Sequence, residues 1–199
     1  MSDLFSYSKI KKSSYDSSDI QVLKGLDPVK KRPGMYIGGN DTEALHHLFN
    51  EVLDNSIDEA ISGYATKINV TFFEDNAVEI EDNGRGIPID PHPDFPNKSA
   101  LEVILTTLHS GGKFSEKVYT NSGGLHGVGI SVVNALSKKL EVKIIRNKIM
   151  WRQEYKNGIP LSKLQKVGKV KKARGTSIKF SPNFIYFQDG INFIPKKIF

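Results

Sequence analysis

A helical pattern of apolar and polar positions runs from residue 42 to residue 62. At roughly 100° per residue, one half of the helical wheel is apolar and carries Leu45, Phe49, Val52, Leu53, Ile57, Ala60 and Ile61. The other half carries a narrow polar stripe, made of Glu51, Asn55, Asp58 and Ser62, and Leu48 is the one large apolar residue out of place. Asn40 and Glu43 have capping-box spacing, and Gly63 is a typical helix stop. The pattern predicts a helix with one packed face and one polar face.

Alternating apolar residues predict a β-hairpin over residues 68–72 and 78–80, and a second one over residues 140–145 and 149–155. A further strand is expected over residues 176–180, and shorter helices are expected over residues 99–109 and 130–136. Residues 20–26 form a short amphipathic piece that should end at Asp27-Pro28. Because helices and strands are grouped and not strictly alternated, the sequence favours an α+β fold, a two-layer α/β sandwich.

Two glycine-bearing segments carry the candidate chemistry. In the first, residues 82–86, Asp82 stands at a strand end before two glycines, so a carboxylate and bare backbone can approach a flat ligand. An ordinary turn is the alternative for these residues. In the second, residues 123–129, glycines before a helix let N–H groups face an anion, with a flexible linker as the alternative. The loop over residues 110–124 could close over a ligand as a lid does.

Taken together, the polar stripe and the glycine segments indicate an ATP site in which a helical glutamate, Glu51, directs water at a phosphate. Alone, the stripe would be read as a solvated face of a helix. The sequence contains neither the dinucleotide-binding glycine fingerprint nor a Walker-type phosphate loop, so another class of ATP site is expected.

Composition narrows the class of protein. The 199 residues include no cysteine, which excludes disulfides, thiolate zinc sites and a cysteine nucleophile. Apolar runs are only a few residues long and the start lacks a signal-peptide pattern, so we expect a cytoplasmic protein without membrane contact. The net charge of +6 is uneven, because residues 138–174 hold 13 lysines and arginines against two glutamates. Such a segment is typical of a solvated surface or of a nucleic-acid contact.

The segments around Glu51, Asp82, residues 111–129 and Gly175-Thr176 resemble the four motifs of the GHKL (Bergerat-fold) ATPases. Within that superfamily the chain is similar to the ATPase subunit of bacterial type IIA topoisomerases, from about residue 15 to residue 180. The likeness is carried by residues 22–27 (VLKGLD), 32–38 (RPGMYIG), 54–60 (DNSIDEA) and 123–136. Residues 90–93 and 129–131 favour the B subunit of topoisomerase IV over that of gyrase. The resemblance implies the GHKL sandwich, with a mixed, mostly antiparallel sheet.

The resemblance also implies a role for each matching residue. Glu51 corresponds to the general base, Asn55 to the ligand of Mg²⁺, and Asp82, supported by Thr176, to the acceptor for the adenine amino group. Tyr15 corresponds to an arm residue that reaches the nucleotide of a partner subunit, so dimerisation is implied. The implied ATP contacts are Tyr15, Asn55, Asp58, Asp82, Gly86, Ile87, Lys113, Gly124, Leu125, His126, Gly127, Val128, Gly129, Ile130 and Thr176. The implied inhibitor pocket at the mouth of the site contains Glu59, Arg85, Pro88 and Arg146.

The domain organisation expected is a flexible arm over residues 1–19 and an ATP-binding domain over residues 20–199, without the family's transducer and cleavage-core domains. We therefore expect a monomeric fragment that binds Mg-ATP with weak or absent turnover. In the full-length enzyme, ATP would drive dimer closure and DNA strand passage with the A-type cleavage subunit. The alternatives are the ATPase domain of the gyrase B subunit, a non-enzymatic DNA-binding module that uses residues 163–174, and a remnant that does not fold.

Overall fold

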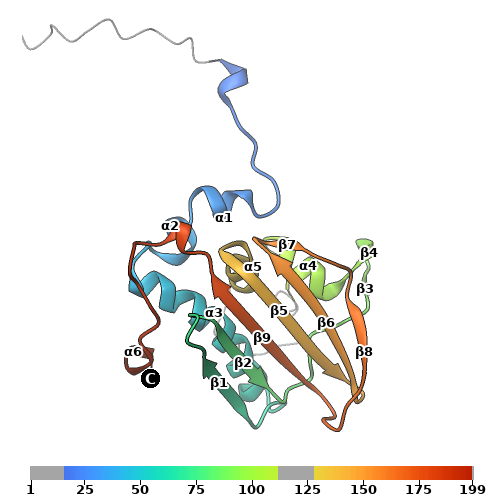
Figure 1. The fold of residues 1–199 in the computed structure, drawn as a ribbon. Helices are drawn as coiled ribbons and strands as arrows, with labels where there is room; N and C mark the ends of the chain where they lie inside the picture. The colour runs from blue at the N-terminus through green and yellow to red at the C-terminus, as the bar shows by residue number, and fades with distance from the viewer. Residues whose placement is uncertain (1–15, 112–127, 199) are drawn as a thin grey trace, which may run out of the picture.

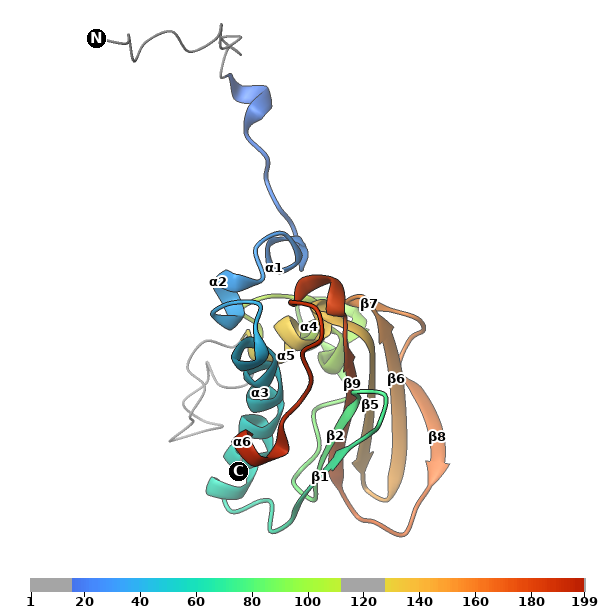
Figure 2. The same cartoon turned by 60° about the vertical axis from the view of Figure 1, so that its left-hand side comes forward.

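The computed structural model describes residues 16–111 and 128–198. Their elements form two layers, a twisted sheet and a group of helices that covers one of its faces (Figures 1 and 2). Within these residues, no helix is both long and apolar enough to cross a membrane. The predicted α+β class is confirmed.

The sheet has seven strands in the order β1-β2-β9-β5-β6-β7, with β8 also paired to β6. Their bounds are β1 Ile68–Phe72, β2 Val78–Asp82, β5 Ser137–Arg146, β6 Ile149–Lys156, β7 Ile159–Pro160, β8 Gln165–Lys169 and β9 Gly175–Pro182. Every strand pairing in the described part of the chain is antiparallel. Both predicted hairpins and the strand over residues 176–180 are confirmed. The register pairs Asp82 at the end of β2 with Thr176 at the start of β9.

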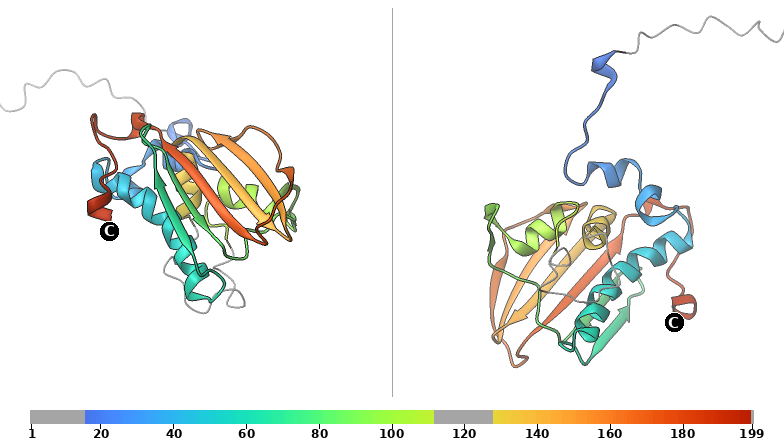
Figure 3. Two further views of the ribbon diagram at one scale, coloured as in Figure 1. Left: turned by 60° about the horizontal axis from the view of Figure 1, so that its bottom comes forward. Right: turned by 180° about the vertical axis from the view of Figure 1, so that it is seen from behind.

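The central helix is α3, Thr42–Ile61, which lies on the same face of the sheet as α4, Ala100–Thr106, and α5, Gly129–Ala135 (Figure 3). The predicted helix is confirmed, as is its end, because Gly63 follows it at φ +76°. The predicted capping box is wrong. The cap is Asp41, whose Oδ1 accepts a hydrogen bond from Ala44 N (3.0 Å), whereas Asn40 Oδ1 accepts one from Gln188 Nε2 (3.3 Å).

The division of α3 into one packed and one polar face is only partly right. Leu48 is fully buried, Asp58 is 1% exposed, and Ile61 on the predicted apolar half is 62% exposed. The reason is that α3 is enclosed on several sides. It packs on β2 and α5, and the chain near Phe193 returns over it, with the ring of Phe193 stacked on that of His46. The polar stripe therefore faces other parts of the protein and not bulk solvent alone.

The remaining short elements correct several sequence expectations. Asp27-Pro28 begins a helix, α1 Asp27–Lys31, and does not end one, because a proline in the first turn lacks only an N–H that the helix leaves unpaired. The predicted helix over residues 99–109 is confirmed as α4, with the Ser99 cap, but it ends at Thr106. The other elements are η1 Ser17–Asp19, α2 Gly34–Ile37, a separate hairpin of β3 Pro91–His92 and β4 Phe95–Ser99, η3 Phe184–Tyr186 and α6 Pro195–Ile198.

Apolar side chains from both layers form one core. Leu45 and Phe49 of α3 meet Ile80, Ile144 and Phe180 of the sheet, and all five are essentially inaccessible to solvent. This core holds α3 against β2, whose end is paired with the start of β9, and the polar residues of the site gather there.

Candidate nucleotide site

The first part of the site lies where the end of β2 meets α3. Asp82, the last residue of β2, is 7% exposed. Its Oδ2 accepts a hydrogen bond from Ser56 Oγ of α3 (3.0 Å), and its Oδ1 accepts one from Gly84 N (2.8 Å). Burial raises the pKa of the Asp82 carboxyl, and the hydrogen bonds from Gly84 and Ser56 oppose part of that rise. The Asp82 carboxylate is therefore fixed in position and largely shielded from solvent, and it can accept a hydrogen bond from a ligand.

Close backbone approach around Asp82 requires glycine. A Cβ at Gly84 would lie 2.7 Å from Glu59 Oε2 and 2.9 Å from Asp82 Oδ1. Gly86 has φ +79°, and a Cβ there would lie 2.9 Å from the carbonyl oxygen of Ile145. These glycines therefore let segments of the chain approach one another closely, and the loop is not a plain exposed turn. The expectation that they let backbone approach a flat ligand stays a prediction.

A salt bridge between Arg85 and Glu59 lies beside Asp82, where the loop after β2 meets α3. Arg85 Nη2 donates to Glu59 Oε1 (2.6 Å), and Arg85 N donates to Glu59 Oε2 (2.9 Å). The guanidinium also lies over the ring of Tyr64, 3.8 Å from the ring centroid. At the end of β5, two strands away from β2, Arg146 Nη1 donates to the carbonyl oxygen of Gly86 (3.2 Å). The two arginines therefore brace the loop that follows Asp82.

The second part of the site lies where α3 meets the start of α5. The Glu51 carboxylate lies directly against Gly129, so that no Cβ could be accommodated there. His47 Nε2 lies 3.2 Å from Glu51 Oε1, one helical turn away, and Asn55 Nδ2 donates to the carbonyl oxygen of Glu51 (2.6 Å). Glu51 is 31% exposed, so its carboxylate is held by neighbours and still open to water.

Comparison with known proteins matches the geometry to a family. Residues 40–184 match the family described as "Histidine kinase-, DNA gyrase B-, and HSP90-like ATPase". This range holds α3, Asp82, Gly129 and Thr176, which are the residues that build both parts of the site. The chain belongs to this ATPase family.

Similar proteins place this ATPase domain within the family more closely. The chain is 57% identical to the B subunit of DNA topoisomerase 4 of Rickettsia conorii, and the match covers 100% of this chain and 31% of that protein. It is 54% identical to the B subunit of DNA topoisomerase 4 of Bartonella bacilliformis, over 94% of this chain and 27% of that protein. Among solved structures, it superimposes on the 43K ATPase domain of Thermus thermophilus gyrase B, in complex with an aminocoumarin, with a TM-score of 0.76 and 44% identity. That match covers 88% of this chain and 43% of the other. The topoisomerase IV ATP binding domain of Francisella tularensis, in complex with a small molecule inhibitor, gives a TM-score of 0.73 and 46% identity over 89% of this chain and 46% of that chain.

The chain is thus an ATPase domain homologous to the B subunits of topoisomerase IV and gyrase, and it spans under a third of the length of the topoisomerase relatives named here. Its expected site residues fall into three groups: those that build the site, those outside the described residues, and a few with other places in the fold. At the end of β2, Asp82 pairs in register with Thr176, and Glu59 binds Arg85 of the following loop. On α3, Asn55 binds the backbone of Glu51, whose carboxylate lies against Gly129. The expected contacts at Tyr15, Lys113, Gly124, Leu125, His126 and Gly127 lie outside the described residues.

The other expected residues have definite places. Asp58 is buried inside the helix–sheet interior, a position that suits holding the site together better than touching a ligand. Ile87 packs against the core, whereas Pro88 is exposed. Val128 is the cap of α5 and accepts a hydrogen bond from Ser131 Oγ (2.8 Å).

Three residues of the ATPase site were missed from the sequence. His47 could have been found, since it stands four residues before Glu51 on the same helix. Ser56 and Tyr64 had no such signal. Ser56 reaches Asp82 only because α3 crosses the end of β2. Tyr64 contacts Arg85 only because the chain after α3 places its ring beneath the guanidinium.

Among the described residues, no group of three or more His, Asp and Glu side chains could hold a metal ion by itself. The Asn55 amide nitrogen is tied to the backbone of α3, which leaves the amide oxygen as the atom that a hard cation would use. Mg²⁺ keeps several waters and takes phosphate oxygens, so one protein oxygen beside a nucleotide fits its chemistry.

Proposed function

We propose that this domain binds Mg-ATP with the adenine at Asp82 and the phosphates between α3 and the start of α5. The observation that carries the proposal is that one helix reaches both ends of the site. On α3, Ser56 holds Asp82 at the end of β2, while Glu51 lies against Gly129 at the start of α5. A flat base with an amino donor would fit the fixed carboxylate, and the phosphates would extend towards Glu51.

Each described residue has a defined part in the proposed chemistry. Asp82 accepts a hydrogen bond from the adenine amino group, with Thr176 beside it. Glu51 takes a proton from the water that attacks the terminal phosphate, and His47 orients the Glu51 carboxylate. Asn55 would hold Mg²⁺, which would supply positive charge to the phosphate oxygens. The corresponding loop contacts, Lys113 and residues 124–127, and the arm contact, Tyr15, remain proposals from the family resemblance.

The inhibitor pocket is likewise a proposal. Arg85 and Pro88 lie in the loop after Asp82, Glu59 binds Arg85, and Arg146 binds the backbone of Gly86. The similar gyrase domain of Thermus thermophilus was solved with an aminocoumarin. We propose that compounds of that kind compete with ATP at this mouth.

In a longer protein, we propose that binding and hydrolysis of Mg-ATP drive dimer closure and DNA strand passage with an A-type cleavage subunit, in the cytoplasm. The support is that the relatives, which are B subunits of DNA topoisomerase 4, are far longer than this chain. We propose that the longer protein is a topoisomerase IV B subunit, because the Rickettsia conorii subunit is 57% identical to this chain. A gyrase B subunit is the alternative, because that of Thermotoga maritima is 53% identical over 88% of this chain. We propose that this chain alone is monomeric and turns over ATP weakly or not at all.

Calorimetric titration with a non-hydrolysable ATP analogue and Mg²⁺ tests the binding proposal. Wild type should bind one equivalent, and Asp82→Asn should bind much more weakly. Glu81→Gln is the matched control, because Glu81 is the neighbouring carboxylate on β2 and faces the other side of the sheet, where it pairs with Lys172. Equal affinity of wild type and Asp82→Asn would contradict the adenine assignment.

A further inference from the structure

After η3 the chain returns across the helical layer and runs beside α3 to the short helix α6 (Figures 1 and 2). We call residues 187–198 the strap. Its first residue, Phe187, is 7% exposed and belongs to the core. Gln188 N donates to the carbonyl oxygen of Asn40 (2.8 Å), and Gln188 Nε2 donates to Asn40 Oδ1 (3.3 Å). The strap is therefore tied to the loop before α3 where it begins.

Further along, the strap is fastened by His46 of α3. The ring of Phe193 is stacked on that of His46, with 6.3 Å between the ring centroids. The same ring meets Phe72 of β1 at 5.9 Å and Phe180 of β9 at 6.1 Å. The next residue, Ile194, donates its N–H to His46 Nε2 (3.1 Å), and His46 is 8% exposed. One side chain of α3 thus holds both a ring and a backbone group of the strap.

The hydrogen bond from the strap fixes the protonation state of His46. Because Nε2 accepts the hydrogen bond, it carries no proton, and the neutral ring has its proton on Nδ1. A protonated imidazole has a donor at each nitrogen, so its Nε2–H would face the N–H of Ile194. The bond between His46 and Ile194 therefore exists only while the ring is neutral.

The charged groups that face His46 come from the strap and from α3 itself. Burial lowers the pKa of the His46 imidazole, the positive charge of Lys197 lowers it further, and Glu43 opposes them. On the sheet side of the strap, β1 and β9 present the apolar rings of Phe72 and Phe180. A proton on His46 would therefore enter a largely apolar setting beside a second positive charge, that of Lys197.

We propose that His46 is a proton-operated latch for the strap, closed while the ring is neutral and opened when the ring takes a proton from solvent. In the released strap the imidazole regains its ordinary pKa of 6.5, so the released form binds the proton more tightly than the attached form. Attachment is therefore strongest above about pH 6.5 and weakens as the pH falls from there through the lowered pKa of His46.

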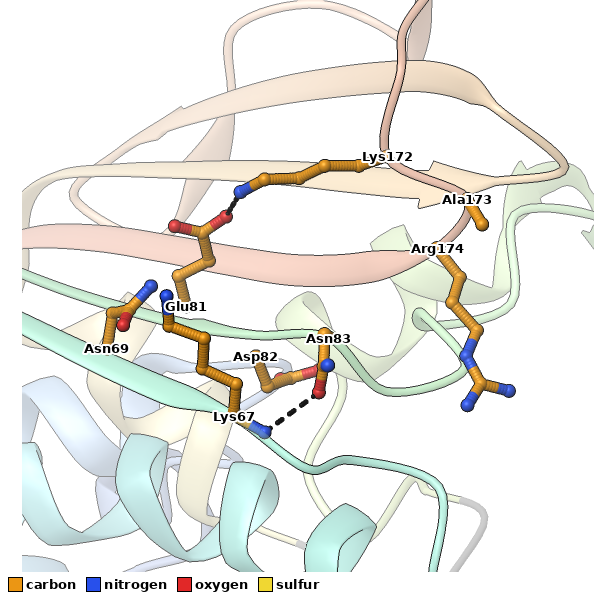
Figure 4. Close-up of a pocket in the computed structure, with 8 residues that line it drawn as sticks. All are labelled: Lys67, Asn69, Glu81, Asp82, Asn83, Lys172, Ala173 and Arg174. Atoms are coloured by element: carbon orange, nitrogen blue, oxygen red, sulfur yellow. Dashed lines mark hydrogen bonds and ion pairs between the residues drawn. The ribbon is translucent and has the colours of Figure 1, made fainter.

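The latch is separate from the nucleotide site. The cavity beside Asp82, which Figure 4 shows, lies near the end of α3, where Ser56 binds Asp82. His46 stands in the second turn of α3, roughly 15 Å along the helix axis from Ser56. It is also about 140° around the helix from Glu51. His46 can therefore be changed without altering either side chain, and the proposal does not depend on the proposed function.

Amide hydrogen exchange of the full chain, followed by NMR at about pH 7.5 and about pH 5, tests the latch. Each exchange rate is divided by that of an unstructured chain at the same pH, which gives a protection factor. The test variant is His46→Gln, because the glutamine Oε1 can accept the hydrogen bond from Ile194 N and does not titrate. The matched control is His92→Gln. It removes another imidazole that accepts a backbone hydrogen bond, since His92 Nδ1 accepts one from Asp94 N (3.1 Å) in the β3–β4 hairpin.

In wild type and in His92→Gln, protection of the Ile194 amide should fall at least about tenfold between the two pH values. Protection of the Phe180 amide, in the middle of β9, should change by less than about twofold. In His46→Gln, protection at Ile194 should stay within about twofold across the same range. Protection at Ile194 that does not respond to pH in wild type, or that falls equally in His46→Gln, overturns the proposal. Equal loss at Phe180 overturns it too, because the whole domain would then be opening.

A second measurement needs no variant that might fold poorly. The imidazole signals of His46 in wild type are followed by NMR from about pH 8 to about pH 5, together with exchange at Ile194. The midpoint for loss of protection should coincide with the midpoint of the His46 titration. Midpoints that differ by about one pH unit or more would show that another group releases the strap, and would overturn the assignment to His46.

Discussion

The two ends of the nucleotide site are built in different ways. At the proposed adenine end, Asp82 is buried at the end of β2 and is held by Ser56 of α3 and by the backbone of Gly84. At the proposed phosphate end, Glu51 is partly exposed, pairs with His47 on its own helix and lies against Gly129. The difference suggests a division of labour, in which the first end selects and anchors a ligand and the second performs chemistry on it.

The largest effect is expected at the phosphate end. Glu51→Gln keeps the shape of the side chain but removes the base, so hydrolysis should fall roughly 10²–10⁴-fold. Binding of the ATP analogue should stay within about threefold of wild type, because the anchor is elsewhere. Single-turnover assays with protein in excess over labelled ATP measure the hydrolysis rate, and calorimetry measures the affinity for the ATP analogue. Because this chain alone is proposed to turn over ATP weakly or not at all, the hydrolysis assay is run in a longer protein whose wild type hydrolyses ATP measurably. There, a variant that hydrolyses as wild type does would remove Glu51 from the role of base.

The next effect is expected at the adenine end. Asp82→Asn replaces a charged acceptor by an amide that can turn a donor towards the base, so affinity should fall by roughly 1.5–3 kcal/mol, or about 10–150-fold. Hydrolysis of the ATP that does bind should be much less affected. If turnover of bound ATP collapsed while affinity held, the division between the two ends would be wrong.

A smaller effect tests the contact between α3 and α5. Gly129→Ala adds a methyl group where the Glu51 carboxylate now lies, and relief of that overlap should cost about 1–3 kcal/mol of unfolding free energy. For a domain of this size the melting temperature should drop by about 2–4 °C per kcal/mol. Gly111→Ala is the control, since no atom of residues 16–111 and 128–198 lies within 4 Å of a Cβ there. Equal melting of the two variants would show that Glu51 moves aside freely.

The smallest effect concerns pH and the stability of the ligand-free protein. Because burial raises the pKa of Asp82 above its ordinary 3.8, the folded state binds this proton more tightly than the unfolded state. The carboxyl therefore costs stability as pH rises through its raised pKa, and that cost vanishes below about pH 3.8. Asp82→Asn without nucleotide should be more stable than wild type at neutral pH, with a gap that narrows on acidification. Urea unfolding at several pH values measures it, and a gap that widens towards low pH would contradict the burial argument.

Much of the fold followed from periodicity. The length of α3, both hairpins and β9 were predictable because apolar positions recur at 3.6 or 2 residues over long segments. The short strand β8 was missed, since Gln165–Lys169 is nearly all polar and exposed and is a strand only through pairing with β6. Leu48 was misjudged because a wheel assumes one buried face, and α3 has several.

The site was less accessible to sequence reasoning. Helical spacing predicted that Glu51 and Asn55 share one stripe of α3. The spacing gave no sign that Asp82 would lie beside Ser56, which is 26 residues earlier in the chain. That meeting depends on how α3 crosses the sheet. The roles of Glu51, Asn55 and Asp82 came from the family resemblance, which the match over residues 40–184 supports at the level of the family.

A crystal structure of this chain with a non-hydrolysable ATP analogue and Mg²⁺ tests the central claim most directly. We predict an adenine amino group within hydrogen-bonding distance of an Asp82 carboxylate oxygen, and a terminal phosphate facing Glu51 across one water. An adenine bound away from Asp82, or a terminal phosphate remote from Glu51, would contradict the account.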